Sequence, residues 1–280
     1  MGMNMKAFES KVLKTIRENS LLSRKEKVVV AMSGGKDSTT VAYLLKKFGY
    51  NVEALHINLH MGKWSDENLE NVKKACREWK IPLHVFSIKK ELGNTICYIK
   101  QVVGSETNYK QCTICGILRR WMINRKAREL GAKKLATGHN LDDEAQTALM
   151  NLFKGNMMLG VNSGPKVGLF EDPMFVTRIK PLYNCLENDV REYSKAMKFP
   201  VLYQRCPCVI GAYRHEVRNH LDALEKKNPK LKENIVKSFT KLLPELRSEV
   251  KIKGIRYCRE CGEPSRNDVC KACQIRSKIK

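Results

Sequence analysis

The chain of 280 residues is long enough for one sizeable hydrophobic core with small appendages. Its net charge of +23, from 52 Lys and Arg against 29 Asp and Glu, favours a polyanionic partner, and nucleic acid is the usual one. No stretch approaches the ~20 apolar residues of a membrane span and no signal-peptide core is present, so we expect a cytoplasmic protein without a membrane. In that reducing compartment, the eleven cysteines favour metal binding or catalysis over disulfides.

Strands and helices alternate along the chain, which predicts an α/β fold whose parallel sheet is covered by helices on both faces. Short apolar runs predict strands at 28–30, 52–59, 83–88, 134–137, 178–182 and, as the last strand, 200–203. Helical spacing of apolar residues predicts helices at 5–20, 66–79, 116–130, 141–153 and 187–197. Another helix is expected between the first two strands, and a basic helical region runs from 213 to about 250.

A glycine-bearing turn, Ser33-Gly34-Gly35-Lys36-Asp37-Ser38, stands between a predicted strand and a predicted helix. The glycines let the backbone approach a phosphate, and the helix start offers free N–H groups and a positive dipole end. Lys36 adds charge, and Asp37 suits a site that also holds Mg²⁺. The spacing differs from the Walker A pattern, and the alternative is an ordinary strand-to-helix turn.

A second segment, Thr137-Gly138-His139-Asn140-Leu141-Asp142-Asp143-Glu144, follows the predicted fourth strand. The two segments together resemble the PP-loop ATP pyrophosphatase family, whose members cleave ATP between the α and β phosphates and adenylate an oxygen of their substrate. The resemblance implies an adenine nucleotide α-hydrolase-like fold. It also implies that ATP contacts both segments and the strand position that lines the adenine pocket: Ser33, Gly34, Gly35, Lys36, Asp37, Ser38, Leu55, Ile57, Gly138, His139 and Asn140.

Asp142 and Asp143 are candidates for catalysis together with Lys36 and Asp37. Adjacent residues on a helix point about 100° apart, so one aspartate can face the ATP site while the other caps or supports the helix. Asp143 is the first choice for the catalytic position. The alternative for both is a helix-terminal charge that stabilises the dipole by ~0.3–1 kcal/mol.

Cysteines recur in the middle of the chain, where Cys112-Thr113-Ile114-Cys115 precedes a predicted helix and Cys206-Pro207-Cys208 follows the predicted last strand. Two thiolates in a C-x-x-C bind a metal or cluster, or act as a redox or persulfide pair. The alternative is a pair of small buried apolar side chains. Ligands bind at the carboxyl edge of open α/β sheets, so the second cysteine pair after a strand favours a functional site.

The order of these motifs resembles the tRNA 2-thiolation group of PP-loop enzymes, the TtuA and NcsA proteins and, more distantly, TtcA. In that group three cysteines hold a 4Fe–4S cluster and leave one iron open for sulfide. The resemblance implies Cys112, Cys115 and Cys206 as ligands, with Cys112 and Cys115 also counted as catalytic. Cys208 stands where the group has a tyrosine, so it is an alternative third ligand.

Two further C-x-x-C pairs, Cys258–Cys261 and Cys270–Cys273, lie near the C-terminus. Such pairs suit tetrahedral Zn²⁺, and metal binding would supply the folding energy of a segment too small for its own core. The segment resembles the C-terminal zinc ribbon of TtuA and NcsA proteins. TtcA-like proteins generally lack that ribbon, so its presence favours uridine over cytidine as the thiolated base.

These features predict an N-terminal helix (1–24), a PP-loop domain (25–210), a basic helical region (211–254) and a zinc ribbon (255–280). The predicted function is ATP-dependent tRNA 2-thiouridine synthesis, in which adenylation of uridine O2 releases pyrophosphate and sulfur then enters at the cluster. The sulfur donor is either sulfide or a ubiquitin-like thiocarboxylate protein, and a homodimer is one open oligomeric state. The alternatives are persulfide-based thiolation without a cluster, cytidine thiolation, and a non-catalytic protein that binds ATP and RNA.

Overall fold

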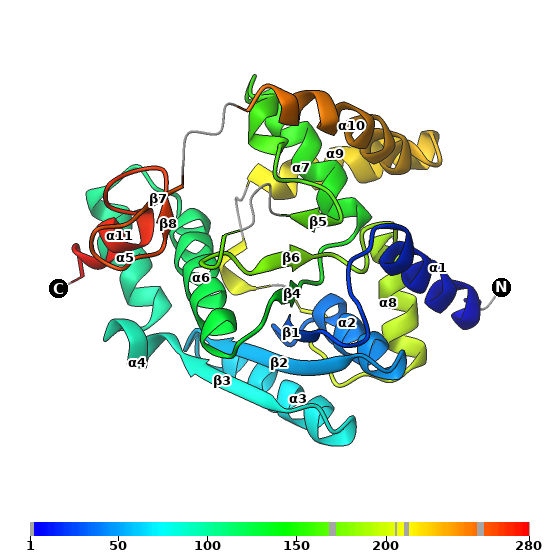
Figure 1. Ribbon diagram of the computed structural model, residues 1–280, viewed down its shortest axis with the longest axis horizontal. Helices are drawn as coiled ribbons and strands as arrows, with labels where there is room; N and C mark the ends of the chain where they lie inside the picture. Colours follow the sequence, from blue (N-terminus) through cyan, green and yellow to red (C-terminus); the bar gives the residue numbers. More distant parts are fainter. Residues whose placement is uncertain (1–2, 168–171, 205, 210–212, 251–254, 280) are drawn as a thin grey trace.

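The main sheet lies at the centre of the computed structural model, which describes residues 3–167, 172–204, 206–209, 213–250 and 255–279 (Figure 1). Within these residues the sheet has six strands in the order β3-β2-β1-β4-β6-β5. All neighbouring pairs are parallel except β5 and β6, which are antiparallel. The predicted parallel sheet is therefore confirmed, and β5 adds an edge strand that the sequence did not predict. The strands are β1 Lys27–Ala31, β2 Asn51–Asn58, β3 Leu83–Ser87, β4 Lys134–Ala136, β5 Lys166–Val167 and β6 Thr177–Ile179.

One face of the sheet is covered by four helices, α1 Met5–Glu18, α2 Lys36–Lys47, α3 Lys63–Glu78 and α8 Glu187–Ala196. Val28 and Val30 of β1 point to this face and are fully buried, because side chains alternate along a strand. The N-terminal helix packs into the same core, with the ring of Phe8 stacked 4.6 Å from that of Tyr193.

The opposite face is covered mainly by α6 Gln111–Glu129, which packs Ala127 against Val29 and Leu135. The helix begins five residues earlier than the predicted start at 116, because the carbonyl of Lys110 accepts hydrogen bonds from the N–H groups of Thr113 and Ile114. Cys112 and Cys115 therefore lie within the first five residues of α6. Two short helices that the sequence did not predict precede it, α4 Ile88–Leu92 and α5 Ile96–Glu106.

The predicted last strand at 200–203 is wrong, since these residues have no strand partner in the structure. The apolar run packs against side chains instead. Phe199 is buried with its ring 5.0 Å from that of Tyr43 and 5.1 Å from that of Trp79, and Val201 packs on the same core. The hydrophobic pattern of this run reflects burial beside the helices, which no short apolar run distinguishes from strand pairing.

The C-terminal part lies beside the sheet as two separate groups of elements (Figure 1). Helices α9 Tyr213–Lys227 and α10 Leu231–Ser248 pack on α7 Leu141–Phe153, while β7 Arg256–Tyr257, β8 Pro264–Ser265 and α11 Lys271–Arg276 form a small unit beside α6. Two short 3₁₀ helices, η1 Met157–Gly160 and η2 Pro207–Val209, complete the elements. The predicted segment boundaries near 210 and 254 lie outside the described residues. No described helix is long and apolar enough to cross a membrane.

Candidate functional site

The glycine-bearing turn, Ser33–Ser38, joins β1 to α2 at the carboxyl edge of the sheet, and it is called the ATP turn below after the ligand that the sequence resemblance implies. Gly34 has a φ of +86°, and a Cβ there would lie 2.5 Å from Oδ1 of Asn68, so only glycine fits. The hydroxyls of Ser33 and Ser38 lie 3.1 Å apart, and the N–H of Ser33 donates to Ser38 Oγ. The turn therefore gathers backbone and hydroxyl donors at the start of α2, where a phosphate is favourably bound.

Lys36 is buried in the first turn of α2. Its ammonium lies 2.8 Å from Oδ2 of Asp37 and 3.0 Å from Oε1 of Glu187. Burial alone would lower the pKa of Lys36, but the two carboxylates more than offset burial and raise that pKa. Lys36 is thus held charged beside the turn, where a phosphate can replace one of its carboxylate partners.

The second sequence segment lies directly against the turn. A Cβ on Gly138 would lie 2.6 Å from the backbone nitrogen of Ser38, so the close approach of the two segments requires glycine. Asn140 caps α7 through a capping box with Asp143, and its Nδ2 donates to Oδ1 of Asp37 over 3.0 Å. The structure therefore brings together the two segments that the sequence singled out.

Asp142 and Asp143 point to different partners, as their helical spacing predicts. Asp142 is buried, and its carboxylate accepts from the ammonium of Lys232 at 2.6 Å and from the N–H of Glu187 at 2.7 Å. Asp143 lies 3.5 Å from Arg214 Nη1 and is closer to the ATP turn. Burial raises the pKa of Asp143, although the positive charge of Arg214 opposes this increase. Burial also raises the pKa of Asp37, and the negative charge of the nearby Asp143 raises it further. Two carboxylates that repel one another in this way are suited to share a divalent cation.

His139 borders the same region. Its Nδ1 lies 2.8 Å from the hydroxyl of Thr137, and part of the residue is exposed to solvent. The protein atoms around the ring, together with the nearby cations Lys180, Arg214 and Arg178, lower the pKa of His139 to about 3. The imidazole is therefore neutral at physiological pH, and the positive charge around it favours an anionic ligand.

A cavity of about 180 Å³ opens beside the turn. Ser33 and Gly35 line one side, and the predicted adenine-pocket residues Leu55 and Ile57 line another. Arg119 of α6 also lines the cavity, so the cavity lies between the ATP turn and the helix that carries the first cysteine pair. Further lining residues that the sequence did not suggest are Trp64, Asn68, Leu202 and Gln204.

The central cysteines lie where α6 meets η2. The helix runs back toward the start of β4, so its N-terminal turn, with Cys112 and Cys115, lies at the carboxyl edge of the parallel strands. Cys206 directly precedes η2, which contacts α6, and the thiol of Cys112 donates to the carbonyl of Cys208 over 3.5 Å. These contacts bring the two central cysteine pairs to the same place, and thiolates are the protein ligands of iron–sulfur clusters.

Cys208 has a partner of its own. The buried ammonium of Lys100 on α5 donates to Cys208 Sγ over 2.9 Å. Burial raises the pKa of both Cys115 and Cys206, and Lys100 partly opposes this at both thiols. Cys208 therefore differs from its neighbours in its contact with a cation, while all four cysteines remain candidate ligands.

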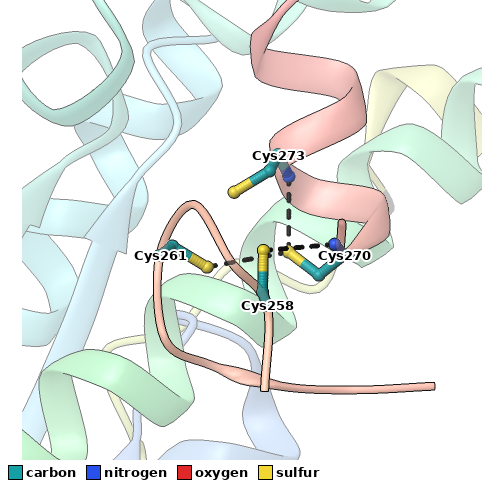
Figure 2. A group of neighbouring side chains, drawn as sticks. All are labelled: Cys258, Cys261, Cys270 and Cys273. Carbon is teal, nitrogen blue, oxygen red and sulfur yellow. Dashed lines mark hydrogen bonds between the residues drawn. The ribbon is translucent and has the colours of Figure 1, made fainter. Parts of the chain in front are cut away.

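The C-terminal cysteines form a second donor set (Figure 2). The four sulfurs of Cys258, Cys261, Cys270 and Cys273 all lie within 4.8 Å of one another, and those of Cys261 and Cys270 are 3.7 Å apart. Thiolates around a tetrahedral metal at about 2.3 Å have sulfur–sulfur edges of about 3.8 Å. Burial would raise the pKa of Cys258, but backbone N–H donors lower it to about 6. The group is thus suited to a metal ion.

The cysteine unit is anchored on α6. Cys258, Cys270 and Cys273 pack in one apolar cluster with Leu118 and Trp121 of that helix. The buried carboxylate of Glu263 pairs with Arg128 and accepts from Nδ2 of Asn124 over 3.0 Å. Both predicted metal sites therefore meet on α6, one at its N-terminal turn and one along its side.

Comparison with known proteins places this geometry in a family. A family model described as a PP-loop domain matches residues 4–203. The chain belongs to the PP-loop family. The matched residues include the sheet, the ATP turn, α7 and the first cysteine pair, and the match ends just before Cys206.

The relatives of this PP-loop protein include tRNA-thiolating enzymes. It is 38% identical over 268 residues to the tRNA-5-methyluridine(54) 2-sulfurtransferase of Pyrococcus horikoshii, covering 96% of this chain and 84% of that protein. It is 35% identical over 276 residues to cytoplasmic tRNA 2-thiolation protein 1 of Drosophila melanogaster, covering 96% and 78%. Among solved structures, it resembles the U34-tRNA thiolase NcsA from Methanococcus maripaludis, which contains a 4Fe–4S cluster, with a TM-score of 0.77, 31% identity and coverage of 96% and 86%.

Two residues of the PP-loop site, Glu187 and Lys232, have no signal in the sequence that identifies them. Glu187 bridges Lys36 and Arg218, with its Oε2 at 2.6 Å from Arg218 Nη2, yet no local pattern marks it. Arg214 and Arg218 are four residues apart on a helix, which predicts a shared face but not its target. Lys232 of α10 pairs with Asp142 of α7, 90 residues earlier in the sequence, and only the fold brings these two residues together.

Proposed function

We propose that this chain is an ATP-dependent tRNA 2-thiolating enzyme of the cytoplasm. The O2 atom of a uridine attacks the α-phosphorus of ATP, and pyrophosphate leaves. Sulfur then attacks C2 of the activated base, and AMP leaves as the C2–O bond breaks. The family membership and the thiolating relatives support the proposal, and one of these relatives is a cytoplasmic tRNA 2-thiolation protein.

The proposal rests on one observation, namely that the ATP turn and α6 line the same cavity. Ser33 and Gly35 of the ATP turn face Arg119 of α6 across it, and α6 carries Cys112 and Cys115 one to two turns earlier. An activated nucleotide base bound there lies between the adenylating residues and the thiols. A base must leave its stack to reach such a position, so we expect a loop or flipped uridine as the substrate.

The polar groups around the turn have distinct proposed roles. Lys36 and the start of α2 hold the phosphates. Asp37 and Asp143 are the residues that would hold Mg²⁺, and a bound Mg²⁺ would stabilise charge on the leaving pyrophosphate. Asp142 supports the site indirectly, because it fixes the N-terminus of α8 and thereby Glu187, the partner of Lys36. His139 contacts the nucleotide as an uncharged imidazole, which keeps one ring N–H as a hydrogen-bond donor.

We propose that Cys112, Cys115 and Cys206 hold a 4Fe–4S cluster, with Cys208 as the alternative third ligand. Bound by these thiols, such a cluster would supply Lewis-acidic iron for the sulfur to be transferred. The chain's own contribution is to fix two thiols within the first five residues of α6 and the third beside η2, which contacts that helix. Lys100 keeps a positive charge next to the thiols and partly offsets the increase that burial causes in the pKa of Cys115 and Cys206.

The C-terminal unit is proposed to bind structural Zn²⁺, since four thiols at tetrahedral spacing leave no open coordination position. Its presence favours uridine over cytidine as the substrate base. The named relatives act on different uridines, at positions 54 and 34, so both are candidate targets here. Sulfide and a ubiquitin-like thiocarboxylate protein remain the candidate sulfur donors.

The test is whether pyrophosphate release depends on tRNA. Purified protein is mixed with ATP, Mg²⁺ and unmodified tRNA transcript, and pyrophosphate is measured with and without the tRNA. We expect release only with tRNA, and a loss of at least about 100-fold in Lys36→Gln, because the missing charge acts on the transition state. Binding of ATP and tRNA without any pyrophosphate release would instead identify a non-catalytic ATP- and RNA-binding protein.

A further inference from the structure

Three arginines, one of which lines the cavity, have no polar partner within the part of the chain that the structure describes. Arg119 and Arg120 lie on α6, and Arg178 lies on β6. None of them makes a hydrogen bond or an ion pair with another described residue. Arg214, Arg218 and Lys36, in contrast, each pair with a carboxylate of the ATP site. The first three arginines are therefore available to a ligand.

The backbone places Arg120 and Arg178 on the same side of the sheet. Arg178 is in register with Leu135, which is in register with Val29, so these three side chains share one face. Val29 and Leu135 pack against Ala127 of α6, which identifies that face as the one α6 covers. Arg120 lies two turns before Ala127 on the same side of α6. Both arginines therefore belong to the interface between α6 and the sheet, near the carboxyl edge.

Arg120 is also next to the first cysteine pair. Its Nη1 atom lies 3.1 Å from the position that a Cβ would take on Gly116, the residue after Cys115. A larger side chain at position 116 would push the guanidinium away. Glycine at this position thus lets a positive charge lie against the turn that carries the thiols.

The electrostatic environment agrees with this geometry. Burial lowers the pKa of Arg120, and its neighbour Arg119 lowers it further, while Cys115 opposes both effects. Burial likewise lowers the pKa of Arg178, and Arg120 adds to that decrease. The guanidinium groups are thus close enough to repel one another without a compensating carboxylate among the described residues. An anion bound between them would remove this repulsion.

We propose that Arg120 and Arg178 bind a phosphodiester group of the RNA substrate, between the ATP turn and the Cys112–Cys115 turn. This inference depends on the proposed function. The ATP phosphates already have Lys36 and the start of α2, whereas Arg120 lies at the cysteine end of the site. A guanidinium donates two parallel hydrogen bonds to a phosphate, so the pair would fix the RNA backbone beside the uridine.

The experiment compares Arg120→Gln, Arg178→Gln and the double variant with Arg17→Gln, which removes an exposed arginine of α1 on the other face of the sheet. Binding of tRNA is measured anaerobically by fluorescence anisotropy at several KCl concentrations. Each site variant should reduce the slope of log K against log salt by about 0.7–0.9 and weaken binding about 3–10-fold at moderate salt. Arg17→Gln should leave the slope unchanged, and all variants should bind a non-hydrolysable ATP analogue as the wild type does.

A second measurement needs no variant. Phenylglyoxal modifies accessible arginines, and mass spectrometry of the treated wild-type protein reports each position. We expect tRNA to protect Arg120 and Arg178, and the ATP analogue to leave them reactive.

Three results would contradict the proposal that Arg120 and Arg178 bind the RNA backbone. An unchanged salt slope with no protection by tRNA would mean that these arginines do not contact RNA. A loss of affinity for the ATP analogue would assign them to the nucleotide phosphates, and loss of iron with full tRNA affinity would assign them to the charge of the thiol site. If the wild type itself bound no tRNA, the proposed function would fail first, so the two failures are distinguishable.

Discussion

At the scale of single residues, two adjacent aspartates of α7 have different surroundings. The carboxylate of Asp142 is buried against Lys232 and the N–H of Glu187, whereas Asp143 lies between Arg214 and the ATP turn. The sequence predicts that the two point apart, because adjacent helical residues do so. Which of them supports the fold depends on Lys232, which is distant in sequence.

The two aspartates should therefore fail in different ways when each is changed to asparagine. The Asp143→Asn variant should release pyrophosphate with tRNA at a rate at least about 100-fold below that of the wild type. It should keep its thermal stability, because its partner Arg214 is partly exposed to solvent. Asp142→Asn should lose about 1–3 kcal/mol of unfolding free energy, since the buried ammonium of Lys232 loses one charged acceptor. Calorimetry and a pyrophosphate assay on both proteins measure the difference. Equal loss of stability in the two variants would contradict these assignments.

His139 offers a pH test at the same scale. Its folded-state pKa is about 3, below the ordinary value of 6.5, so between these pH values the unfolded chain binds a proton that the native protein does not. The contribution of His139 to stability therefore falls as pH falls through that window. In NMR spectra of ¹³C-labelled histidines, the His139 signal, assigned through His139→Gln, should not move between pH 8 and pH 5. A titration midpoint near 6.5 would show that the ring is not surrounded as the structure has it.

At the scale of elements, the contact between the two PP-loop segments depends on Gly138. A Cβ there would lie 2.6 Å from the nitrogen of Ser38 and 2.8 Å from the carbonyl carbon of Asp37, both backbone atoms that cannot move aside without shifting the turn. Gly138→Ala should therefore weaken binding of an ATP analogue by at least about tenfold, as a misplaced binding turn does. Isothermal titration calorimetry measures this affinity.

The matched control is Gly104→Ala on α5, where a Cβ meets nothing within 4 Å. That change should leave nucleotide affinity unaltered and stabilise the helix by about 0.5–1 kcal/mol. If both variants bound the ATP analogue like the wild type, the close contact at Gly138 would not be part of the nucleotide site.

Elements with a strong local signal were predicted well, and elements that depend on partners were not. The helix predicted at 141–153 matches α7, because Asn140 and Asp143 form a capping box that is visible in the sequence. The run at 200–203 has the composition of a strand, but Phe199 and Val201 bury themselves against Tyr43, Trp79 and the core. The start of α6 was placed too late because its N-cap, Lys110, is not a typical capping residue.

At the scale of the whole molecule, α6 connects the two cysteine sites. Its first five residues include Cys112 and Cys115, and its side packs against Cys258, Cys270 and Cys273. The sequence predicts each set of cysteines from its spacing alone. Their common helix could not be predicted, since it depends on Glu263 reaching Arg128 and Asn124 across the fold.

This anchoring gives a further prediction. Glu263→Gln should lower the unfolding free energy by about 1–3 kcal/mol, because the partly buried guanidinium of Arg128 loses its charged partner. Limited proteolysis should then cut the C-terminal unit sooner, while zinc content stays at one per chain. The exposed neighbour Glu260→Gln is the control and should behave as wild type. Faster cleavage in the control variant as well would show that the Glu263 contact is not what holds the unit.

ATP cleavage and sulfur transfer are proposed to occur at the same edge of the sheet, as two separable steps. The measurement is a single-turnover reaction under strict anaerobiosis with tRNA, ATP and sulfide, in which pyrophosphate, 2-thiouridine and bound iron are determined for the wild type and Cys112→Ala. We predict that the wild type forms both pyrophosphate and 2-thiouridine. The Cys112→Ala variant should release pyrophosphate but bind little iron and form no 2-thiouridine. Thiouridine formed by Cys112→Ala at the wild-type rate would contradict the account.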